Sequence, residues 1–339
     1  MLALVKTERG DGHLALLDRP IPTPTPGWVR IEVTYGGICG TDLHILHDHF
    51  PYWPPVTLGH EFTGTIEAVG AGVDESLVGR RVVCEPHSLA CGTCHLCRRG
   101  VAELCASKRS PGWGIDGAFG RFVVMPGHLV HRVPDAVPDR VAALAEPMAI
   151  AVTALLRGRV DAGDTVLVVG PGPVGILLAV AARAMGAGAV IVSGRADSER
   201  LRFAAWVGFT TAIGGAAVDV VQNASATRGA DLVVEASGTE DGIALAIGAA
   251  RRRGRMVAVG LSGVERLQLP WDLAVSRSLD LSFSMSSSFA AWEPALGILA
   301  GATTALEPMT TIFALTDWEA AFAAVADRAV IKALLDPRS

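Results

Sequence analysis

Short apolar runs alternate with longer alanine-rich stretches through the second half of the chain. Thr165–Val169 is apolar and β-branched, and after a glycine-rich turn come the alanine-rich Ile176–Met185 and a second apolar run, Ala189–Val192. Such runs predict buried strands, and the stretch between them predicts a helix. Around a further helical stretch, Gly242–Arg252, three more apolar runs continue the alternation: Asp231–Val234, Met256–Val259 and Leu279–Ser282. Strands that alternate with helices predict the α/β fold class, with a doubly wound parallel sheet.

The first part of the chain has a different pattern. Four prolines at alternate positions mark a loop: Pro20, Pro22, Pro24 and Pro26. Many short β-like runs follow, of which Val29–Val33 is one. We therefore expect a second, mostly β domain in front of the α/β domain.

Gly170, Gly172 and Gly175 form a G-x-G-x-x-G turn, with Pro173 and Val174 between the last two glycines. The first glycine permits a tight turn, the second lets the backbone approach a pyrophosphate, and the third lets helix and strand pack closely. An ordinary glycine-rich turn is the alternative. The turn follows a predicted strand and opens a predicted helix, and this context favours a dinucleotide site at the helix N-terminus.

The end of the second predicted strand bears on which dinucleotide is bound. An NAD site usually has an acidic residue about twenty residues beyond the glycines, to bind the ribose 2′-hydroxyl. Here that position reads Ser193, Gly194 and Arg195, and Arg200 follows. Small residues with arginines accommodate a 2′-phosphate, so we expect a preference for NADP(H). Asp197 keeps NAD(H) open as the alternative.

Composition and charge narrow the function classes. The chain has 339 residues, of which 50% are hydrophobic and 19% charged, enough for two domains and too apolar for a disordered chain. The formal net charge of −5 gives no reason to expect nucleic acid or an anionic membrane as partner. We interpret the dense basic run Arg251–Arg253 with Arg255 as a solvated helix C-terminus.

Two apolar segments could suggest export or a membrane span. Charged residues follow Met1–Val5 at once, which leaves no room for a signal-peptide core. Thr165–Ala182 carries no charge, but its glycines and prolines would break a spanning helix. We therefore expect a soluble, cytoplasmic protein.

Four of the six cysteines form a C-x2-C-x2-C-x7-C cluster, namely Cys91, Cys94, Cys97 and Cys105. Thiolates at this spacing can converge on one tetrahedral zinc ion, and four of them leave no position for substrate, so we expect a structural site. An iron–sulfur cluster is the rival, but its usual run has the fourth cysteine after three residues and a proline behind it. Cys84 lies in an apolar run and is interpreted as a small buried hydrophobe.

A second set of possible metal ligands is spread over separate segments. Cys39 lies in a glycine-flanked turn, His60 and Glu61 follow Gly59, and Glu146 comes much later. A lone histidine on an apolar stretch is more often a core residue than a ligand. Spacing alone therefore leaves this set undecided.

Seven segments together resemble the zinc-dependent medium-chain dehydrogenase/reductase family of alcohol, sorbitol and threonine dehydrogenases. They occur in the family's order over nearly the whole chain: GICGTDLH, LGHEFTG, the four-cysteine lobe, DGAFGRF, EPMAIAVTAL, GPGPVG and IKALLDP. The resemblance implies a GroES-like catalytic domain at 1–150 with a structural zinc lobe at about 84–110. It further implies a Rossmann dinucleotide domain at 151–290 and a return to the catalytic domain at 291–339, with the active site in the cleft between domains.

The resemblance also implies roles for single residues. Cys39 and His60 match ligands of a catalytic zinc, Glu146 matches the third ligand position, and Glu61 matches a carboxylate that coordinates or stands just behind. Zinc with an open position is a Lewis acid that lowers the pKa of an alcohol, whose carbon then gives hydride to nicotinamide. Thr41 and His44 match a proton relay through the cofactor ribose. The alternatives are a turn residue for Thr41 and a surface imidazole for His44.

These observations together predict a zinc-dependent oxidoreductase that transfers hydride between a secondary alcohol, or its ketone, and NADP(H). The expected substrate is a polyol, a cyclitol or an amino alcohol, and Glu146, where classical alcohol dehydrogenases have cysteine, favours the polyol branch of the resemblance. One alternative is an NAD-dependent sorbitol- or threonine-type dehydrogenase. Another is a non-catalytic protein that binds zinc and dinucleotide as a sensor or structural component. The resemblance implies a homodimer or homotetramer.

Overall fold

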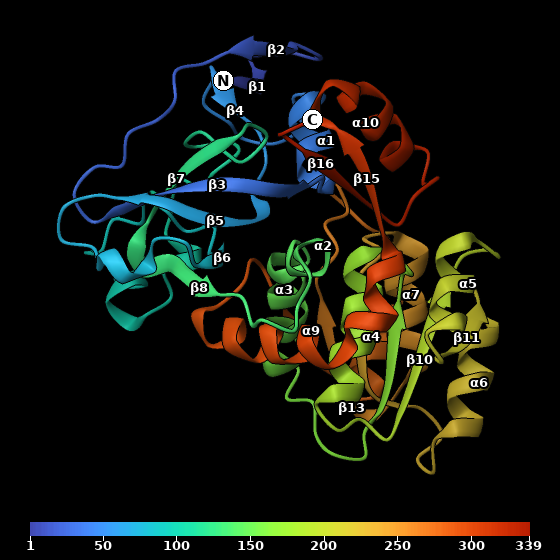
Figure 1. Ribbon diagram of the computed structural model, residues 1–339. Coiled ribbons are helices and arrows are strands. Elements are labelled where there is room, and N and C mark those ends of the chain that lie inside the picture. The colour runs from blue at the N-terminus through green and yellow to red at the C-terminus, as the bar shows by residue number, and fades with distance from the viewer. The chain divides into compact units, whose positions relative to one another are not determined.

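The computed structural model describes residues 1–339 and divides into two units (Figure 1). The first unit comprises Met1–Glu146 and Leu299–Ser339, and the second comprises Pro147–Ile298. Both boundaries lie within helices, α3 (Ala145–Arg157) and α9 (Trp292–Leu306). The first unit is therefore built from two separate stretches of chain.

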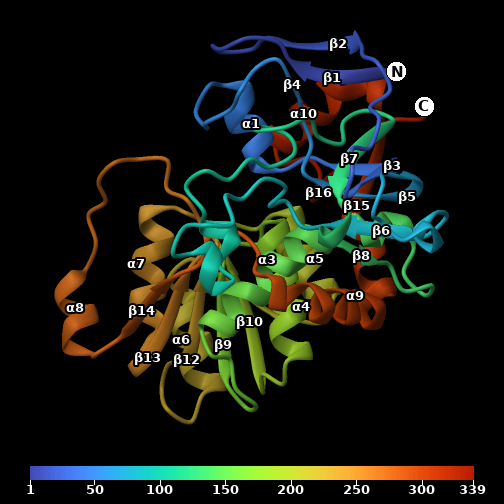
Figure 2. The same ribbon diagram turned by 90° about the vertical axis from the view of Figure 1, so that its left-hand side faces the viewer.

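The second unit contains one six-stranded parallel sheet, which confirms the predicted doubly wound α/β class. Its strands follow the order β11-β10-β9-β12-β13-β14, and Figure 2 shows β10, β9, β12, β13 and β14 side by side. The strands are β9 (Thr165–Val169), β10 (Ala189–Gly194), β11 (Thr210–Ile213), β12 (Ala230–Glu235), β13 (Ala250–Ala258) and β14 (Asp280–Phe283). The chain moves outward from β9 to β11 and then returns to β12 on the other side of β9. The strand order therefore reverses between β9 and β12, where open α/β sheets bind ligands.

Helices connect these strands: α4 (Pro173–Ala184), α5 (Glu199–Trp206), α6 (Ala216–Ala224), α7 (Glu240–Ala249) and α8 (Trp271–Ser276). Strand β9 is buried along its whole length, and α4 is buried from Gly175 to Ala182. The uncharged stretch Thr165–Ala182 is thus a buried strand, a turn and a buried helix, as predicted. None of the helices combines the length and the apolar character needed to cross a bilayer.

The basic run is placed differently from our interpretation, which was wrong. Helix α7 ends at Ala249, and the arginines lie in β13, which begins at Ala250. Arg251 donates from Nε to Asp231 Oδ1 at 2.6 Å, and Arg255 forms an ion pair with Asp164 at 2.8 Å. These carboxylates stabilise the basic run within β13. The two carboxylates lie 20 and 91 residues away from their arginines in the sequence. The expectation that cations lie at a helix C-terminus considers only neighbouring residues and could not include them.

The first unit is mostly β, as predicted. Its larger sheet has the order β15-β16-β3-β5-β6-β8, with β7 paired to β3, and its smaller sheet has the order β2-β1-β4. The strands are β1 (Leu2–Lys6), β2 (Leu14–Asp18), β3 (Trp28–Gly37), β4 (Val56–Thr57), β5 (Glu61–Val69), β6 (Arg81–Cys84), β7 (Phe122–Pro126), β8 (Val130–Arg132), β15 (Thr310–Ala314) and β16 (Lys332–Asp336). The helices are α1 (Gly40–Leu46), α2 (Asp139–Ala142) and α10 (Trp318–Ala326), and 3-10 turns occur at η1 (Glu75–Leu77), η2 (Cys97–Arg99), η3 (Ala102–Leu104), η4 (Gly127–Leu129), η6 (Glu307–Met309) and η7 (Leu315–Asp317), with η5 (Phe289–Ala291) in the second unit.

The C-terminal stretch packs into the core of the first unit. Phe322 of α10 lies edge-on to the buried Phe119, with ring centroids 6.4 Å apart. Strand β16 pairs antiparallel with the end of β3, where Leu334 is opposite Gly37. Residues about 300 positions apart are thereby brought to the same end of β3.

The glycine turn gives a stability test with an internal control. A Cβ at Gly175 would lie 1.8 Å from Gly170 O, whereas a Cβ at Gly172 would meet nothing within 4 Å. Gly175→Ala should therefore lower the free energy of unfolding by about 1–3 kcal/mol through overpacking, and Gly172→Ala should leave it unchanged. Urea unfolding of both variants measures this. Equal stability of the two variants would contradict the close packing of strand and helix at Gly175.

Candidate metal centres and dinucleotide site

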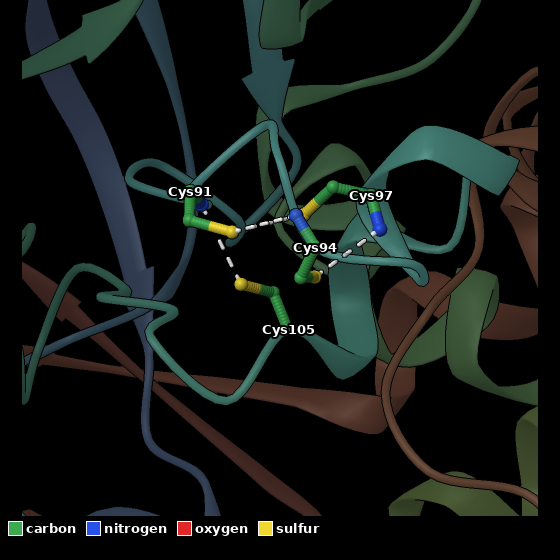
Figure 3. A group of neighbouring side chains, drawn as sticks. All are labelled: Cys91, Cys94, Cys97 and Cys105. Carbon is green, nitrogen blue, oxygen red and sulfur yellow. Dashed lines mark hydrogen bonds between the residues drawn. The ribbon is translucent and has the colours of Figure 1, made fainter.

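The four clustered cysteines converge, as Figure 3 shows. Their Sγ atoms all lie within 4.8 Å of one another. Gly92 and Gly100, with φ of +68° and +76°, supply the turns that fold this short segment back on itself. Backbone N–H groups point at the sulfurs, with Cys94 N donating to Cys91 Sγ at 3.3 Å and Cys91 N donating to Cys105 Sγ at 3.4 Å.

These contacts already favour thiolates. The Cys94 N–H group lowers the pKa of the Cys91 thiol to about 6, and the Cys91 N–H group lowers the pKa of Cys105. Burial instead raises the pKa of Cys97 to about 12. Four thiolates at this distance would repel one another unless a cation lay between them. The donor set therefore fits a tetrahedral, closed zinc site.

Strand register explains why the second set of ligands meets. Strands β3 and β5 pair antiparallel with Gly37 opposite Glu61. Cys39 follows β3 by two residues, and His60 immediately precedes β5. The ligand atoms of Cys39, His60 and Glu61 consequently lie within 4.8 Å of one another. A Cβ on Gly37 would lie 2.7 Å from Glu61 Oε2, so only glycine admits the carboxylate there.

Two charged residues at this site were not singled out by sequence analysis. Asp42 is fully buried, and its Oδ2 accepts from Cys39 N at 2.8 Å. Its Oδ1 lies 3.9 Å from His60 Nδ1, and neither of these buried atoms has a hydrogen-bond partner. A carboxylate behind an imidazole is the arrangement that orients metal-binding histidines. The only sequence signal was the position of Asp42 in the turn motif after Cys39.

The second of these residues is Lys332, at the start of β16. Its ammonium group forms a buried ion pair with Glu61 and donates to Ile38 O at 2.9 Å. Burial alone would lower the pKa of Lys332, but the Glu61 carboxylate and Cys39 outweigh it, and the pKa is raised. Glu61 therefore has a cationic partner from the chain itself. The available signal was the place of this lysine in the terminal IKALLDP segment.

The remaining predicted residues lie at different distances from this group. Glu146, in the first turn of α3, is buried and interacts electrostatically with Glu61 and His60, but lies outside the 4.8 Å set. Burial, with the Glu61 carboxylate, raises the pKa of Glu146 to about 7. Thr41 Oγ1 lies 3.7 Å from Cys39 Sγ. His44 is exposed one turn further along α1, and its carbonyl accepts from His49 N at 2.7 Å.

Aromatic rings lie beside His60. The imidazole is edge-on to Trp113 with centroids 5.1 Å apart, and Trp113 is edge-on to Phe50 at 5.4 Å. Trp53 N donates to Trp113 O at 2.8 Å, which ties the two segments together. An apolar wall thus borders the Cys39–His60–Glu61 group.

The glycine turn has the features of a dinucleotide site. Gly170 has φ of +106°, and its N–H donates to Ser193 O at 2.8 Å, which joins the ends of β9 and β10. Gly172 precedes α4 as its N-cap, with Pro173 in the first turn and Val174 partly exposed. No side chain covers this end of α4 at Gly172, so a phosphate can approach its free N–H groups.

The segment after β10 contains arginines, whereas the acidic residue Asp197 is already in an ion pair. Ser193 and Gly194 are buried, whereas Arg195 is exposed and Arg200 lies partly buried in the first turn of α5. Ser193 Oγ is buried and has no hydrogen-bond partner. Asp197 forms an ion pair with Arg202 at 3.0 Å. The acid that would suit an NAD ribose thus already has a cationic partner.

Zinc content tests the four-cysteine cluster. Cys94→Ser should remove one equivalent of bound zinc and destabilise the protein, because a serine hydroxyl does not replace a thiolate ligand. Cys84→Ala is the control, since Cys84 is buried outside both ligand groups. Elemental analysis of both variants after dialysis measures this. An unchanged zinc content in Cys94→Ser would contradict a metal at the cluster.

Comparisons with known proteins agree with this geometry. The model for an alcohol dehydrogenase GroES-like domain matches residues 25–135, and the model for a zinc-binding dehydrogenase matches residues 173–301. Sorbitol dehydrogenase of Halalkalibacterium halodurans is 37% identical and is covered, like this chain, over 99% of its length. Among solved structures, a zinc-binding dehydrogenase from Sinorhizobium meliloti bound to NADP is 30% identical, with a TM-score of 0.89. An alcohol dehydrogenase from Escherichia coli complexed with NADH is 26% identical, with a TM-score of 0.88. Each match covers 99% of both chains. The chain therefore belongs to the zinc-binding dehydrogenases of the medium-chain dehydrogenase/reductase family, and is an oxidoreductase with a GroES-like domain and a Rossmann-type domain.

Proposed function

We propose that this enzyme is a zinc-dependent dehydrogenase that interconverts a secondary alcohol and its ketone with NADP(H). The observation that carries the proposal is the group formed by Cys39, His60 and Glu61, whose ligand atoms lie within 4.8 Å of one another. A structural role alone does not require a mixed set of thiol, imidazole and carboxylate beside an apolar wall. Such a set is typical of catalytic zinc, which keeps one position open.

Two zinc ions per subunit fit the donor sets. Cys91, Cys94, Cys97 and Cys105 would hold the structural ion. Cys39 and His60 would hold the catalytic ion, with Glu146 as third ligand and Glu61 as a ligand or near neighbour. The unpartnered His60 Nδ1 beside Asp42 fits an imidazole whose other nitrogen binds metal. When bound, the catalytic zinc supplies Lewis acidity that lowers the pKa of an alcohol.

The chain's own residues would move the alcohol proton. Thr41 has a hydroxyl that both accepts and donates, and it lies next to the Cys39 sulfur. His44 is exposed to solvent on the same helix and can pass the proton to water. We assign Thr41 as the first acceptor and His44 as the exit, with the cofactor ribose between them.

For the cofactor we propose NADP(H), with Gly170, Gly172, Pro173, Val174 and Gly175 holding the pyrophosphate. Ser193, Gly194, Arg195 and Arg200 would hold the 2′-phosphate. The unpartnered Ser193 hydroxyl, the exposed Arg195 and the pairing of Asp197 with Arg202 support this assignment. Use of NAD(H) is the alternative, since the two similar structures are bound to different dinucleotides.

The substrate class we propose is a polyol, cyclitol or amino alcohol, in agreement with the similarity to a sorbitol dehydrogenase. We assign residues 1–150 and 291–339 to the catalytic domain and 151–290 to the dinucleotide domain. We also propose a homodimer or homotetramer. Large apolar side chains exposed at the β14 edge of the second unit support it, among them Trp271, Val275, Phe283 and Met285.

The proton relay is tested by Thr41→Val. Because the variant lacks the hydroxyl but keeps the side-chain shape, turnover should fall by about 10²-fold or more, while zinc content stays that of the wild type. Thr41→Ser, which keeps a hydroxyl, is the matched control and should retain most activity. Steady-state rates with a panel of polyols, cyclitols and amino alcohols measure this. Wild-type turnover in Thr41→Val would refute the relay.

Cofactor choice is tested by initial rates with NADP⁺ and NAD⁺ at equal concentrations. The wild type should be faster with NADP⁺ when both are below saturation. Arg195→Ala should raise KM for NADP⁺ by about tenfold or more, because it removes a charged hydrogen bond to the 2′-phosphate, and should leave KM for NAD⁺ nearly unchanged. Faster wild-type turnover with NAD⁺ would establish the alternative.

A further inference from the structure

Glu235, the last residue of β12, is a fully buried carboxylate without an ion-pair partner. Its Oε1 accepts from Ser237 N at 2.7 Å, from Ser237 Oγ at 2.5 Å and from Gly238 N at 3.0 Å. Oε2 has only a longer contact from Gly238 N, at 3.3 Å. Burial raises the pKa of Glu235, and the same hydrogen bonds act against that rise. A buried carboxylate without a cation is costly to a fold, so what this side chain contributes lies in the hydrogen bonds that it accepts.

The side chain instead fixes the turn that follows β12. Ser237 Oγ, held by Glu235, accepts from Thr239 N at 3.2 Å. Thr239 in turn caps α7 by accepting from Gly242 N at 3.1 Å. One carboxylate oxygen thus sets the path of the backbone from the end of β12 to the start of α7.

This turn lies directly against the glycine turn after β9. A Cβ on Gly170 would come within 2.9 Å of Ser237 N, so the two backbones touch with no side chain between them. Ala236 N also donates to Val169 O at 2.8 Å. The turn after β13 joins them, because a Cβ on Gly260 would come within 2.3 Å of Gly238 N and 3.0 Å of Glu235 Oε2.

The three turns meet where the strand order reverses, between β9 and β12. Ligands of open α/β sheets bind at the carboxyl ends of the strands at this point. A wall in which glycine backbone packs directly on backbone can approach a dinucleotide closely, but the glycines have no side chains to hold its shape. The side chain of Glu235 holds that shape through the hydrogen bonds that it accepts from Ser237 and Gly238.

We propose that Glu235 is a positioning residue for dinucleotide binding, which holds the Ser237–Thr239 turn against the Gly170 turn as one wall of the site. The inference rests on the proposed use of a nicotinamide dinucleotide. The effect comes from the position of the Oε1 acceptor, and the charge of the carboxylate is not needed for it.

Substitutions at Glu235 separate the position of the Oε1 acceptor from the charge of the carboxylate. Glu235→Gln keeps an oxygen in the Oε1 position and loses only the long Oε2 contact, so dissociation constants for NADP⁺ and NAD⁺ should stay within about threefold of wild type. Glu235→Asp keeps the charge but withdraws the acceptor by one methylene, so both constants should rise by about tenfold or more. Isothermal titration of each dinucleotide, without substrate, measures them.

A matched control lies at the other end of the same strand. Asp231 accepts from Thr165 N at 2.9 Å and pairs with Arg251, far along β12 from the glycine turns. Asp231→Asn should lower the melting temperature but leave both dissociation constants within about twofold, because it changes no turn of the site. This control separates a local effect on the wall from general destabilisation of the sheet.

Hydrogen exchange of the free wild-type protein provides a test that does not depend on a variant's folding. The amide protons of Ser237 and Gly238 should be protected in the absence of dinucleotide, and Glu235→Asp should lose that protection while the rest of β12 keeps it. Rapid exchange of both amides in the wild type would overturn the positioning role. So would dinucleotide binding in Glu235→Asp within twofold of wild type. Wild-type protein that binds neither NADP⁺ nor NAD⁺ would overturn the proposed function, and the inference with it.

Discussion

The candidate metal site of the first unit is shaped by one constraint, which is that several acidic groups are buried close together. Cys39, Asp42 and Glu61 are brought together by the pairing of β3 with β5, and burial raises the pKa of both Cys39 and Asp42. Acidic groups in such a place need positive charge nearby, or they remain protonated. Lys332 supplies one positive charge, through its ion pair with Glu61. A metal cation between Cys39 and His60 would supply the second, and we regard the site as built for it.

The second unit solves a different physical problem, the approach of a doubly negative diphosphate to backbone. Where the turns after β9 and β12 meet, Gly170 has no Cβ to separate its backbone from that of Ser237. Backbone N–H groups at the start of α4 then replace side-chain cations as anion donors. The buried acceptor of Glu235 gives the second turn a fixed shape, which the glycines alone cannot do.

Most of the features that could be predicted from the sequence depend on residues that are close together in the chain. Thr165–Val169 was predicted with the bounds that the structure has, because a fully buried parallel strand is a continuous apolar run. The four cysteines lie within fifteen residues, so their spacing alone brings them together. Cys39 lies on a different segment from His60 and Glu61. Their approach depends on strand register, which spacing could not show, and only the family resemblance implied that they act together.

Most of the missed and mistaken features depend on partners that are distant in the sequence. Asp42 and Lys332 acquire their meaning from partners that only the fold brings near, Lys332 from Glu61 across 271 positions. The basic run at Arg251–Arg255 was assigned to a helix end because its carboxylate partners, Asp231 and Asp164, could not be foreseen from local sequence. Glu235 was not singled out, since the predicted run ended at Val234 and a buried carboxylate with backbone partners leaves no pattern in the sequence.

Anomalous diffraction from crystals of the protein at the zinc absorption edge tests the central claim most directly. The account predicts two peaks per subunit, one enclosed by the sulfurs of Cys91, Cys94, Cys97 and Cys105, and one between the Cys39 sulfur and the His60 imidazole. A map from zinc-replete crystals with no peak beside Cys39 and His60 would contradict it.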